Sequence, residues 1–324
     1  MEVLPVIDLS SPAAASEIDR ACRDTGFFLV SGHGVPAADL DVLDRAARAF
    51  FACPADEKAE IAMARGGRAW RGWFPEGGEL TSGRPDRKEG IYFGADLPTD
   101  DPRVAAGLLL HGPNLYPRHP VGLRTAVDRW MADMTSVGHR LLELIAEGLG
   151  LEPQWFRQRI TADPTVLFRI FRYPVGTGEV DADPDADAWG VGEHTDYGLV
   201  TILAHDGTPG LQVRSRAGWL DVPARPDTFV INLGDMLDRM TQGRYRSTPH
   251  RVRRTVGPRD RLSFPFFFDP GWDTEIGPVP LLDGELPPDD ADTRWDGASV
   301  HAWEGTYGDY LSAKVAHVFP DLAP

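Results

Sequence analysis

From Thr165 to Pro174 the chain reads TVLFRIFRYP, a run rich in β-branched and aromatic residues that ends at a proline. Such residues favour β-strands. Six more short runs follow: VTILAHD (200–206), LQVRS (211–215), GWLDVPA (218–224), TFVINLGD (228–235), HRVRR (250–254) and RLSFPFFFDP (261–270). Short strands at this spacing indicate an all-β sandwich or barrel. We therefore expect a mainly β protein whose core, at residues 164–275, is an antiparallel double sheet.

The first 150 residues are expected to be richer in helix and to cover that core. Two short strands are expected, in PVIDLSS near the N-terminus and in GFFLVSGHGV from Gly26. Apolar residues recur at helical spacing from Ala37 to about Phe51 and, more strongly, from about Gly122 to Leu149. A further helix is predicted from about Ser16 to Gly26, and another at the C-terminus, residues 300–324.

Between these helices, residues 66–94 include the stretch RAWRGWFPEGGELTSGRPDRKEGIYFG, which is rich in Gly, Pro, Trp and charge. This composition predicts one long ordered loop, and long loops inside compact proteins often carry function. We expect this segment to act as a lid. The acidic stretch DADPDADAWG (181–190) predicts a solvated loop; a Ca²⁺ site is the alternative, although the spacing does not fit an EF-hand.

Composition excludes several classes of partner. The 324 residues contain 33 Lys and Arg against 49 Asp and Glu, a net charge of −16, which argues against nucleic acid or an anionic membrane as the main partner. The two cysteines form no disulfide framework, and neither a signal peptide nor an apolar run long enough to span a membrane is present. We expect one cytoplasmic domain, monomeric or a weak homo-oligomer, with a small-molecule substrate.

The stretch Gly192-Glu193-His194-Thr195-Asp196-Tyr197-Gly198 contains a His-x-Asp pair. If EHTDYGLVTIL is one strand, His194 and Asp196 project from the same face. His250 follows a proline-ended turn and is the candidate third ligand. Two imidazoles and one carboxylate leave three positions open on a metal, as in non-haem Fe(II) oxygenases. Taken singly, each of these side chains could equally be a structural residue.

A second pair of residues favours the metal interpretation. Arg261 and Ser263 lie at i and i+2 of the strand RLSFPFFFDP, and so on one face. A guanidinium and a hydroxyl placed in this way can hold a carboxylate. The alternative is an arginine in a surface ion pair, which the combination with His194, Asp196 and His250 disfavours.

Together these motifs resemble the isopenicillin N synthase-like family of Fe(II)- and 2-oxoglutarate-dependent dioxygenases. The resemblance extends from PVIDLS near the N-terminus through GEHTDYGLVTIL, VINLGDML, STPHRV and RLSFPFFFDP to TYGDYLSAKVAHVFP. It implies a double-stranded β-helix, or jelly roll, with helices packed outside. It also implies Fe(II) ligation by His194, Asp196 and His250, and binding of 2-oxoglutarate by Arg261, Ser263 and Tyr173. Many plant members have Asn where this chain has Phe171, so contacts made by that Asn do not carry over.

The resemblance further implies oxidation of a small metabolite or natural-product intermediate with O₂, giving succinate and CO₂ as coproducts. Because Asp196 retains its carboxylate, hydroxylation, desaturation or cyclisation is favoured over halogenation. Three alternatives stay open. They are an iron-dependent oxidase of the same fold that does not use 2-oxoglutarate (isopenicillin N synthase-type or aminocyclopropane carboxylate oxidase-type), an ethylene-forming type, and a binding module without catalysis.

The substrate residues are less clearly indicated. Phe267 shares a strand face with Arg261 and Ser263, and points either into the pocket or into the core. GGELTSGRPDRKEGIYFG resembles a segment of bacterial and fungal members that act on small molecules, including the ethylene-forming type. Within or beside it we take Arg71, Trp73, Lys88 and Tyr92 as candidate substrate contacts. For Arg71 and Lys88 the alternative is an ordinary surface charge.

Overall fold

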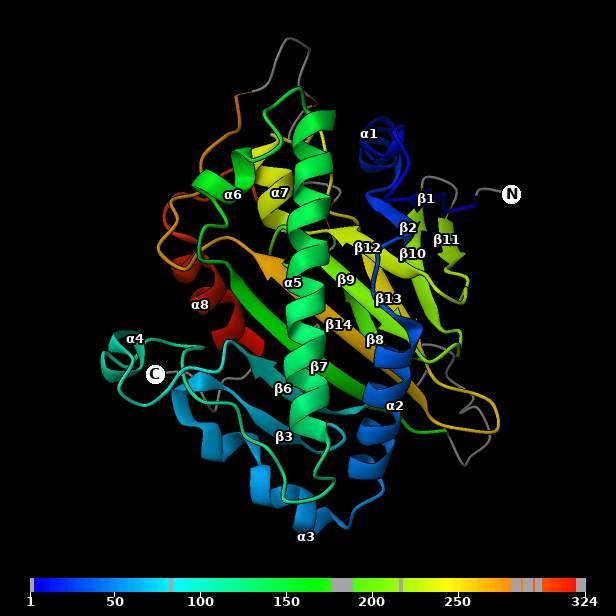
Figure 1. Ribbon diagram of the computed structural model, residues 1–324, viewed down its shortest axis with the longest axis vertical. Helices are drawn as coiled ribbons and strands as arrows, with labels where there is room; N and C mark the ends of the chain where they lie inside the picture. Colours follow the sequence, from blue (N-terminus) through cyan, green and yellow to red (C-terminus); the bar gives the residue numbers. More distant parts are fainter. Residues whose placement is uncertain are drawn as a thin grey trace.

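The strands of the protein form two larger sheets and one short hairpin (Figure 1). The computed structural model describes residues 3–81, 84–175, 189–215, 218–280, 287, 294 and 299–318. The acidic stretch at 181–188 lies outside these residues, whereas Trp189 and Gly190 already belong to a strand.

The eight-stranded main sheet has the order β1-β2-β12-β9-β14-β7-β6-β3, and the four-stranded second sheet has the order β11-β10-β13-β8. Neighbouring strands are antiparallel in both sheets except β1 and β2, which are parallel. This arrangement, with helices outside, confirms the predicted jelly-roll class. The bounds of the strands are β1 Val6–Asp8, β2 Phe27–Ser31, β3 Gly72–Phe74, β4 Leu80–Thr81, β5 Arg84–Pro85, β6 Glu89–Gly94, β7 Thr165–Tyr173, β8 Trp189–His194, β9 Val200–His205, β10 Leu211–Ser215, β11 Gly218–Asp221, β12 Phe229–Leu233, β13 His250–Arg253 and β14 Arg261–Asp269.

Helices flank the sheets in the part of the chain that the structure describes. They are α1 Ala14–Asp24, α2 Ala37–Phe51, α3 Ala55–Lys58, α4 Pro102–Ala105, α5 Leu123–Gly148, α6 Trp155–Arg159, α7 Asp235–Met240 and α8 Tyr307–Val318, with two 3₁₀ turns at Ala59–Ile61 and Met63–Ala69. Figure 1 shows the long helix α5 lying across the main sheet, and α5 also packs against α1, α2 and α6. The predicted bounds of α2 and α5 agree with the structure to within one residue.

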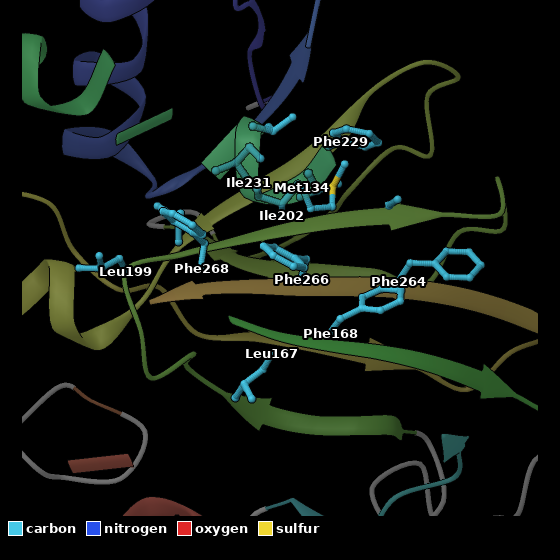
Figure 2. Close-up of a cluster of buried hydrophobic side chains, with 14 of the residues drawn as sticks. Met134, Leu167, Phe168, Leu199, Ile202, Phe229, Ile231, Phe264, Phe266 and Phe268 are labelled. Atoms are coloured by element: carbon cyan, nitrogen blue, oxygen red, sulfur yellow. The ribbon is translucent and has the colours of Figure 1, made fainter. Parts of the chain in front are cut away.

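Strand β14 shows how alternation divides the main sheet into two faces. Phe264, Phe266 and Phe268 are fully buried, and Figure 2 shows them in a cluster with Met134 of α5 and Ile202 of β9. The odd-numbered residues of the same strand, from Arg261 to Asp269, line a cavity on the opposite face. A strand has a side-chain period of two, so one short sequence supplies both the core and the site.

The segment 66–94 is not one long loop, and that prediction was wrong. It contains β3 and β6, and β6 pairs with β7 to extend the main sheet. Its glycines obscured the strand pattern, yet one of them is required. A Cβ at Gly90 would lie 2.7 Å from ring atoms of both Phe171 and Phe74. The glycine therefore lets the two aromatic rings close over the strand.

Two further expectations need correction. Residues 1–150 do not only cover the core, since β1, β2, β3 and β6 form the two ends of the main sheet. The C-terminal helix begins at Tyr307 rather than at residue 300, and its last expected residues, 319–324, lie outside the described chain. The helix is preceded by Thr306, whose hydroxyl donates to Asp309 (2.7 Å) and marks the start of the first turn.

Candidate active site

A cavity of about 730 Å³ lies between the two sheets. Its walls come from β7, β9 and β14 of the main sheet, from β8, β10 and β13 of the second sheet, and from α8. Of the residues predicted to form the site, those that line it are His194, Asp196, His250, Arg261, Ser263, Tyr173, Phe267 and Lys88. Arg71, Trp73 and Tyr92 do not line it.

His194, Asp196 and His250 converge on one point at the wall of this cavity. One potential ligand atom from each lies within 4.8 Å of the other two. Asp196 Oδ1 is 3.9 Å from His194 Nε2 and 3.8 Å from His250 Nε2. These separations suit three ligands on one face of a metal with bonds of about 2 Å.

The second sheet brings the two histidines together, because His250 of β13 pairs directly with His194 of β8. Asp196 arrives differently from our prediction. Strand β8 ends at His194, so strand alternation does not place the carboxylate. Instead, a turn carries Asp196 back toward the histidines, and its carbonyl accepts a hydrogen bond from Asp235 N (2.8 Å).

Close backbone packing holds this turn in place. A Cβ at Gly234 would lie 2.4 Å from Gly198 O, and a Cβ at Gly198 would overlap the carboxylate of Asp269. Gly198 is also part of the quoted motif EHTDYG. Its role is steric, because only glycine leaves room for both neighbours.

Neighbouring groups orient the three ligand atoms. Nδ1 of His194 lies 2.8 Å from Gly192 O, and Nδ1 of His250 lies 3.3 Å from Thr248 O. Since a carbonyl only accepts, each Nδ1 carries the proton and each Nε2 keeps its lone pair for a metal. Oδ2 of Asp196 accepts from Thr201 Oγ1 (2.5 Å) and Asn232 Nδ2 (2.7 Å), which turns Oδ1 toward the histidines.

The protonation states also suit a cation. Burial, and then the neighbouring His194, lower the pKa of His250 to about 4, and burial lowers the pKa of His194. Burial alone would raise the pKa of Asp196, but the two imidazoles and the hydrogen bonds from Asn232 and Thr201 outweigh it and lower this pKa. At neutral pH the cluster therefore presents two neutral imidazoles and a carboxylate, which are the forms that bind metals.

Arg261 and Ser263 lie on the cavity face of β14, next to the metal cluster. Both are 2% exposed. The Arg261 guanidinium lies 4.8 Å from the ring centre of Tyr173, and its Nε donates to Thr208 O (3.3 Å). Its Nη1 is buried and has no hydrogen-bond partner among the described residues. A buried unpaired donor of this kind is what a bound carboxylate would satisfy.

The candidate substrate residues separate into two groups. Lys88 lines the cavity and is not a surface charge, because it is 3% exposed and pairs with Glu79 (2.8 Å) and Asp86 (2.6 Å). Phe267 also lines the cavity, which is the first of the two positions that the sequence left open. Arg71 is fully buried away from the cavity and donates to the carbonyls of Ala69 and Leu110.

Trp73 and Tyr92 are likewise buried outside the cavity. Trp73 Nε1 donates to Glu89 (2.8 Å), and the Tyr92 hydroxyl donates to Glu79 (2.5 Å). Both side chains therefore support charged residues of β6 and its neighbourhood. The prediction that they contact the substrate directly is not supported by their positions.

Several cavity residues were missed by sequence reasoning. Arg169 lies two and four residues before Phe171 and Tyr173 on β7, so alternation could have revealed it. Asp269 follows Phe267 at the same spacing on β14. Trp303, Tyr307 and Tyr310 come from the C-terminal segment, and no local pattern in the sequence places that segment over the cavity.

The fold and this cluster define a jelly-roll oxygenase of the non-haem iron class. Residues 4–119 match the model of the N-terminal region of non-haem dioxygenases, described for morphine synthesis, and residues 165–270 match the 2OG-Fe(II) oxygenase superfamily. The chain belongs to this superfamily, and is thus an oxidoreductase of a family defined by Fe(II) and 2-oxoglutarate. The resemblance drawn from the sequence motifs is confirmed.

Relatives match over nearly the whole chain. A probable iron/ascorbate oxidoreductase of Dictyostelium discoideum is 44% identical, with 99% of this chain and 96% of the relative covered. The 1-aminocyclopropane-1-carboxylate oxidase of Dictyostelium mucoroides is 33% identical, with the same coverage. Among solved structures, a 2OG-Fe(II) oxygenase family protein from Caulobacter crescentus superposes with a TM-score of 0.78 at 27% identity, covering 98% of this chain and 99% of that protein.

Proposed function

We propose that the protein is an Fe(II)- and 2-oxoglutarate-dependent dioxygenase that oxidises a small organic molecule by hydroxylation, desaturation or cyclisation. The observation that carries this proposal is the presence, in one cavity, of the His194–Asp196–His250 cluster and the unpaired buried Nη1 of Arg261. The first is suited to a divalent metal and the second to the carboxylate of a cosubstrate.

Nε2 of each histidine and Oδ1 of Asp196 would hold Fe(II). Thr201 and Asn232 keep the other carboxylate oxygen engaged, so Asp196 would offer the metal Oδ1 alone. Fe(II) and 2-oxoglutarate supply the oxidising chemistry when bound, since O₂ is reduced as 2-oxoglutarate loses CO₂ to become succinate. The task of the chain is positioning and exclusion of water.

Arg261 and Ser263 would hold the distal carboxylate of 2-oxoglutarate, with the Tyr173 ring packed against the guanidinium. The remaining space is bordered by aromatic side chains, including Phe171 of β7, Phe267 of β14, and Trp303 from the segment before α8. Such walls favour a substrate with an apolar body and exclude water from the reaction centre.

A second candidate is an oxidase of the same fold that does not consume 2-oxoglutarate. It is favoured by the whole-length similarity to a 1-aminocyclopropane-1-carboxylate oxidase. An ethylene-forming type of reaction is a variant of the first candidate.

Stoichiometry separates the two candidates. We expect the Fe(II)-loaded enzyme to form about one succinate per O₂ consumed, both in uncoupled turnover and with substrate. Oxygen electrode traces combined with chromatographic assay of succinate would measure this ratio, with His194→Ala as the inactive control. Oxygen uptake that is supported by a reductant such as ascorbate and yields no succinate would establish the second candidate instead.

We further propose that the enzyme works in the cytoplasm as a monomer or weak homo-oligomer. Both cysteines are free thiols, which suits a reducing compartment. Within the described part of the chain, no helix has both the length and the apolar character needed to cross a membrane.

A further inference from the structure

The cavity wall contains two arginines among the described residues, Arg261 and Arg169, and the buried Nε of Arg169 has no hydrogen-bond partner there. Its side chain is 21% exposed. The guanidinium carbon lies 4.1 Å from the ring centre of Tyr92 and 4.9 Å from that of Phe267. These two rings hold the guanidinium by its faces and leave its N–H edge for another group.

The nearest carboxylate does not fill that role. Glu79 Oε1 is 3.7 Å from Arg169 Nη1, which is too long for a hydrogen bond. Glu79 is already engaged by the Tyr92 hydroxyl (2.5 Å) and by Lys88 (2.8 Å). Arg169 therefore stands beside an acid whose Oε1 accepts from Tyr92 and whose Oε2 is ion-paired with Lys88.

The position of Arg169 along β7 suits a substrate rather than the cosubstrate. Phe171 pairs with Ser263, and Leu167 pairs with Phe267, so Arg169 lies between the proposed carboxylate clamp and the Phe267 ring. Tyr173, which pairs with Arg261, is four residues away, roughly 13 Å along a strand. A 2-oxoglutarate held by Arg261 and Ser263 thus leaves Arg169 to another occupant.

Desolvation makes a matching group necessary. Water satisfies the N–H groups of Arg169 while the cavity is hydrated. An apolar molecule that displaces this water without offering an acceptor would leave a buried guanidinium unpaired, which is unfavourable. A carboxylate on the substrate would replace those hydrogen bonds with charge-assisted ones.

From these observations we infer that the substrate is a carboxylic acid with an apolar body, and that Arg169 binds its carboxylate. This inference rests on the proposed function, because it concerns the same cavity. Arg169 anchors one end of the molecule, and the aromatic walls direct the rest toward the metal cluster.

The test uses matched probes and the anaerobic enzyme loaded with Fe(II) and saturating 2-oxoglutarate, so that Arg261 is occupied. The probes are a panel of aryl- and alkyl-substituted carboxylic acids, each with its primary amide and primary amine. Dissociation constants come from quenching of tryptophan fluorescence, since Trp303 lines the cavity. We expect at least one acid to bind about tenfold or more tightly than its amide, as charge-assisted hydrogen bonds require.

The variants assign that preference to one residue. Arg169→Gln should reduce the acid-over-amide preference to about threefold or less, and Arg169→Lys should retain part of it, because an ammonium keeps the charge but not the bidentate geometry. Arg157→Gln, at an exposed position on α6, should behave as wild type. The KM for 2-oxoglutarate in uncoupled turnover should change by less than about twofold in all three variants, as Arg169 lies apart from the clamp.

Three results would overturn the inference: no acid binds better than its amide, the preference survives in Arg169→Gln, or the amines bind best. If Arg169→Gln does not fold, the inference is tested by the acid-over-amide preference of the wild type and by its partial loss in Arg169→Lys. Failure of the proposed function would give a different result. The enzyme would then form no succinate in the stoichiometry experiment, whichever probes bind.

Discussion

At the scale of single residues, the metal cluster depends on side chains that do not themselves reach the metal. Asp196 can present Oδ1 to the cluster because Thr201 and Asn232 hold Oδ2. Asn232 lies on β12 and Thr201 on β9, two paired strands of the main sheet. The carboxylate is therefore oriented from the opposite sheet to the one that carries the histidines.

This arrangement predicts that Asn232→Ala weakens metal binding. Loss of one of two donors to Asp196 should raise the dissociation constant about 10- to 100-fold, as is usual for partners of metal ligands. Anaerobic calorimetry with Mn(II), a redox-stable substitute for Fe(II), measures the change directly. Thr201→Ser retains the hydroxyl and serves as the matched control. An unchanged Mn(II) affinity in a folded Asn232→Ala protein would contradict the role given to Asn232.

At the scale of elements, helix α5 and strand β14 pack closely enough to require a glycine. A Cβ at Gly138 would lie 2.6–2.9 Å from three ring atoms of Phe268, which is fully buried. This contact holds the back of the strand whose other face carries Arg261, Ser263 and Phe267. The rigidity of the clamp thus depends on a helix that does not contact the cavity.

Two opposing effects determine the outcome of Gly138→Ala. Alanine is favoured over glycine within a helix by about 1 kcal/mol, whereas overpacking a tight core costs about 1–3 kcal/mol. Because the Cβ would meet Phe268 at Cγ, near the backbone end of a fully buried side chain, we expect a net loss of about 1–2 kcal/mol in the free energy of unfolding. Urea denaturation measures it.

A second substitution checks the cause. Phe268→Leu in the Gly138→Ala background should make the alanine less unfavourable than it is alone, which a double-mutant cycle would show. Gly122→Ala, where a Cβ would meet nothing within 4 Å, should leave stability nearly unchanged. A stabilised Gly138→Ala protein would mean that helix propensity outweighs the contact.

At the scale of the whole molecule, Asp269 connects three parts of the chain that are distant in sequence. This residue ends β14, accepts a hydrogen bond from Leu199 N (3.1 Å) beside the metal-binding turn, and accepts another from the Tyr307 hydroxyl (2.6 Å) at the start of α8. The C-terminal helix is thereby attached to the end of β14, and its residues Tyr307, Tyr310 and Leu311 line the cavity.

Asp269 should make stability depend on pH. Burial raises the pKa of its carboxyl from 3.8 to about 7, so the folded protein holds this proton more tightly than the unfolded chain does. The resulting stabilisation is complete below pH 3.8 and is lost as the pH rises toward 7. The slope is about 1.4 kcal/mol per pH unit, or roughly 4 kcal/mol in all.

The variant Asp269→Asn, which cannot ionise, isolates this effect. For the metal-free proteins, we expect the free energy of unfolding of the variant minus that of the wild type to increase between about pH 4 and pH 7 and then to level off. Denaturant titrations across this range test the expectation. Taking the difference removes the opposite contribution of His250, whose lowered pKa makes acid destabilising. A difference that does not vary with pH would refute the assignment.

Much of the site could be predicted from the sequence, because its key residues follow local rules. Strand alternation alone placed Arg261, Ser263 and Phe267 on one cavity face. His194, Asp196 and His250 were also predicted, but the reason predicted for Asp196, strand alternation with His194, was wrong. Strand β8 ends at His194, and the turn that follows it delivers the carboxylate. Arg169 was missed, although it shares the alternation of β7 with Phe171 and Tyr173, because an arginine within a strand has no local mark that separates a cavity residue from a surface charge.

The sequence by itself determined the class of fold, the family and the identity of the groups suited to metal and cosubstrate, because these depend on short-range periodicity and residue chemistry. Only the tertiary structure decided what surrounds them. It showed that 66–94 adds strands to the main sheet, that Arg71, Trp73 and Tyr92 lie outside the cavity, and that α8 closes it. These features arise from contacts between segments far apart in the chain, and no local pattern of residues encodes the distance between such segments.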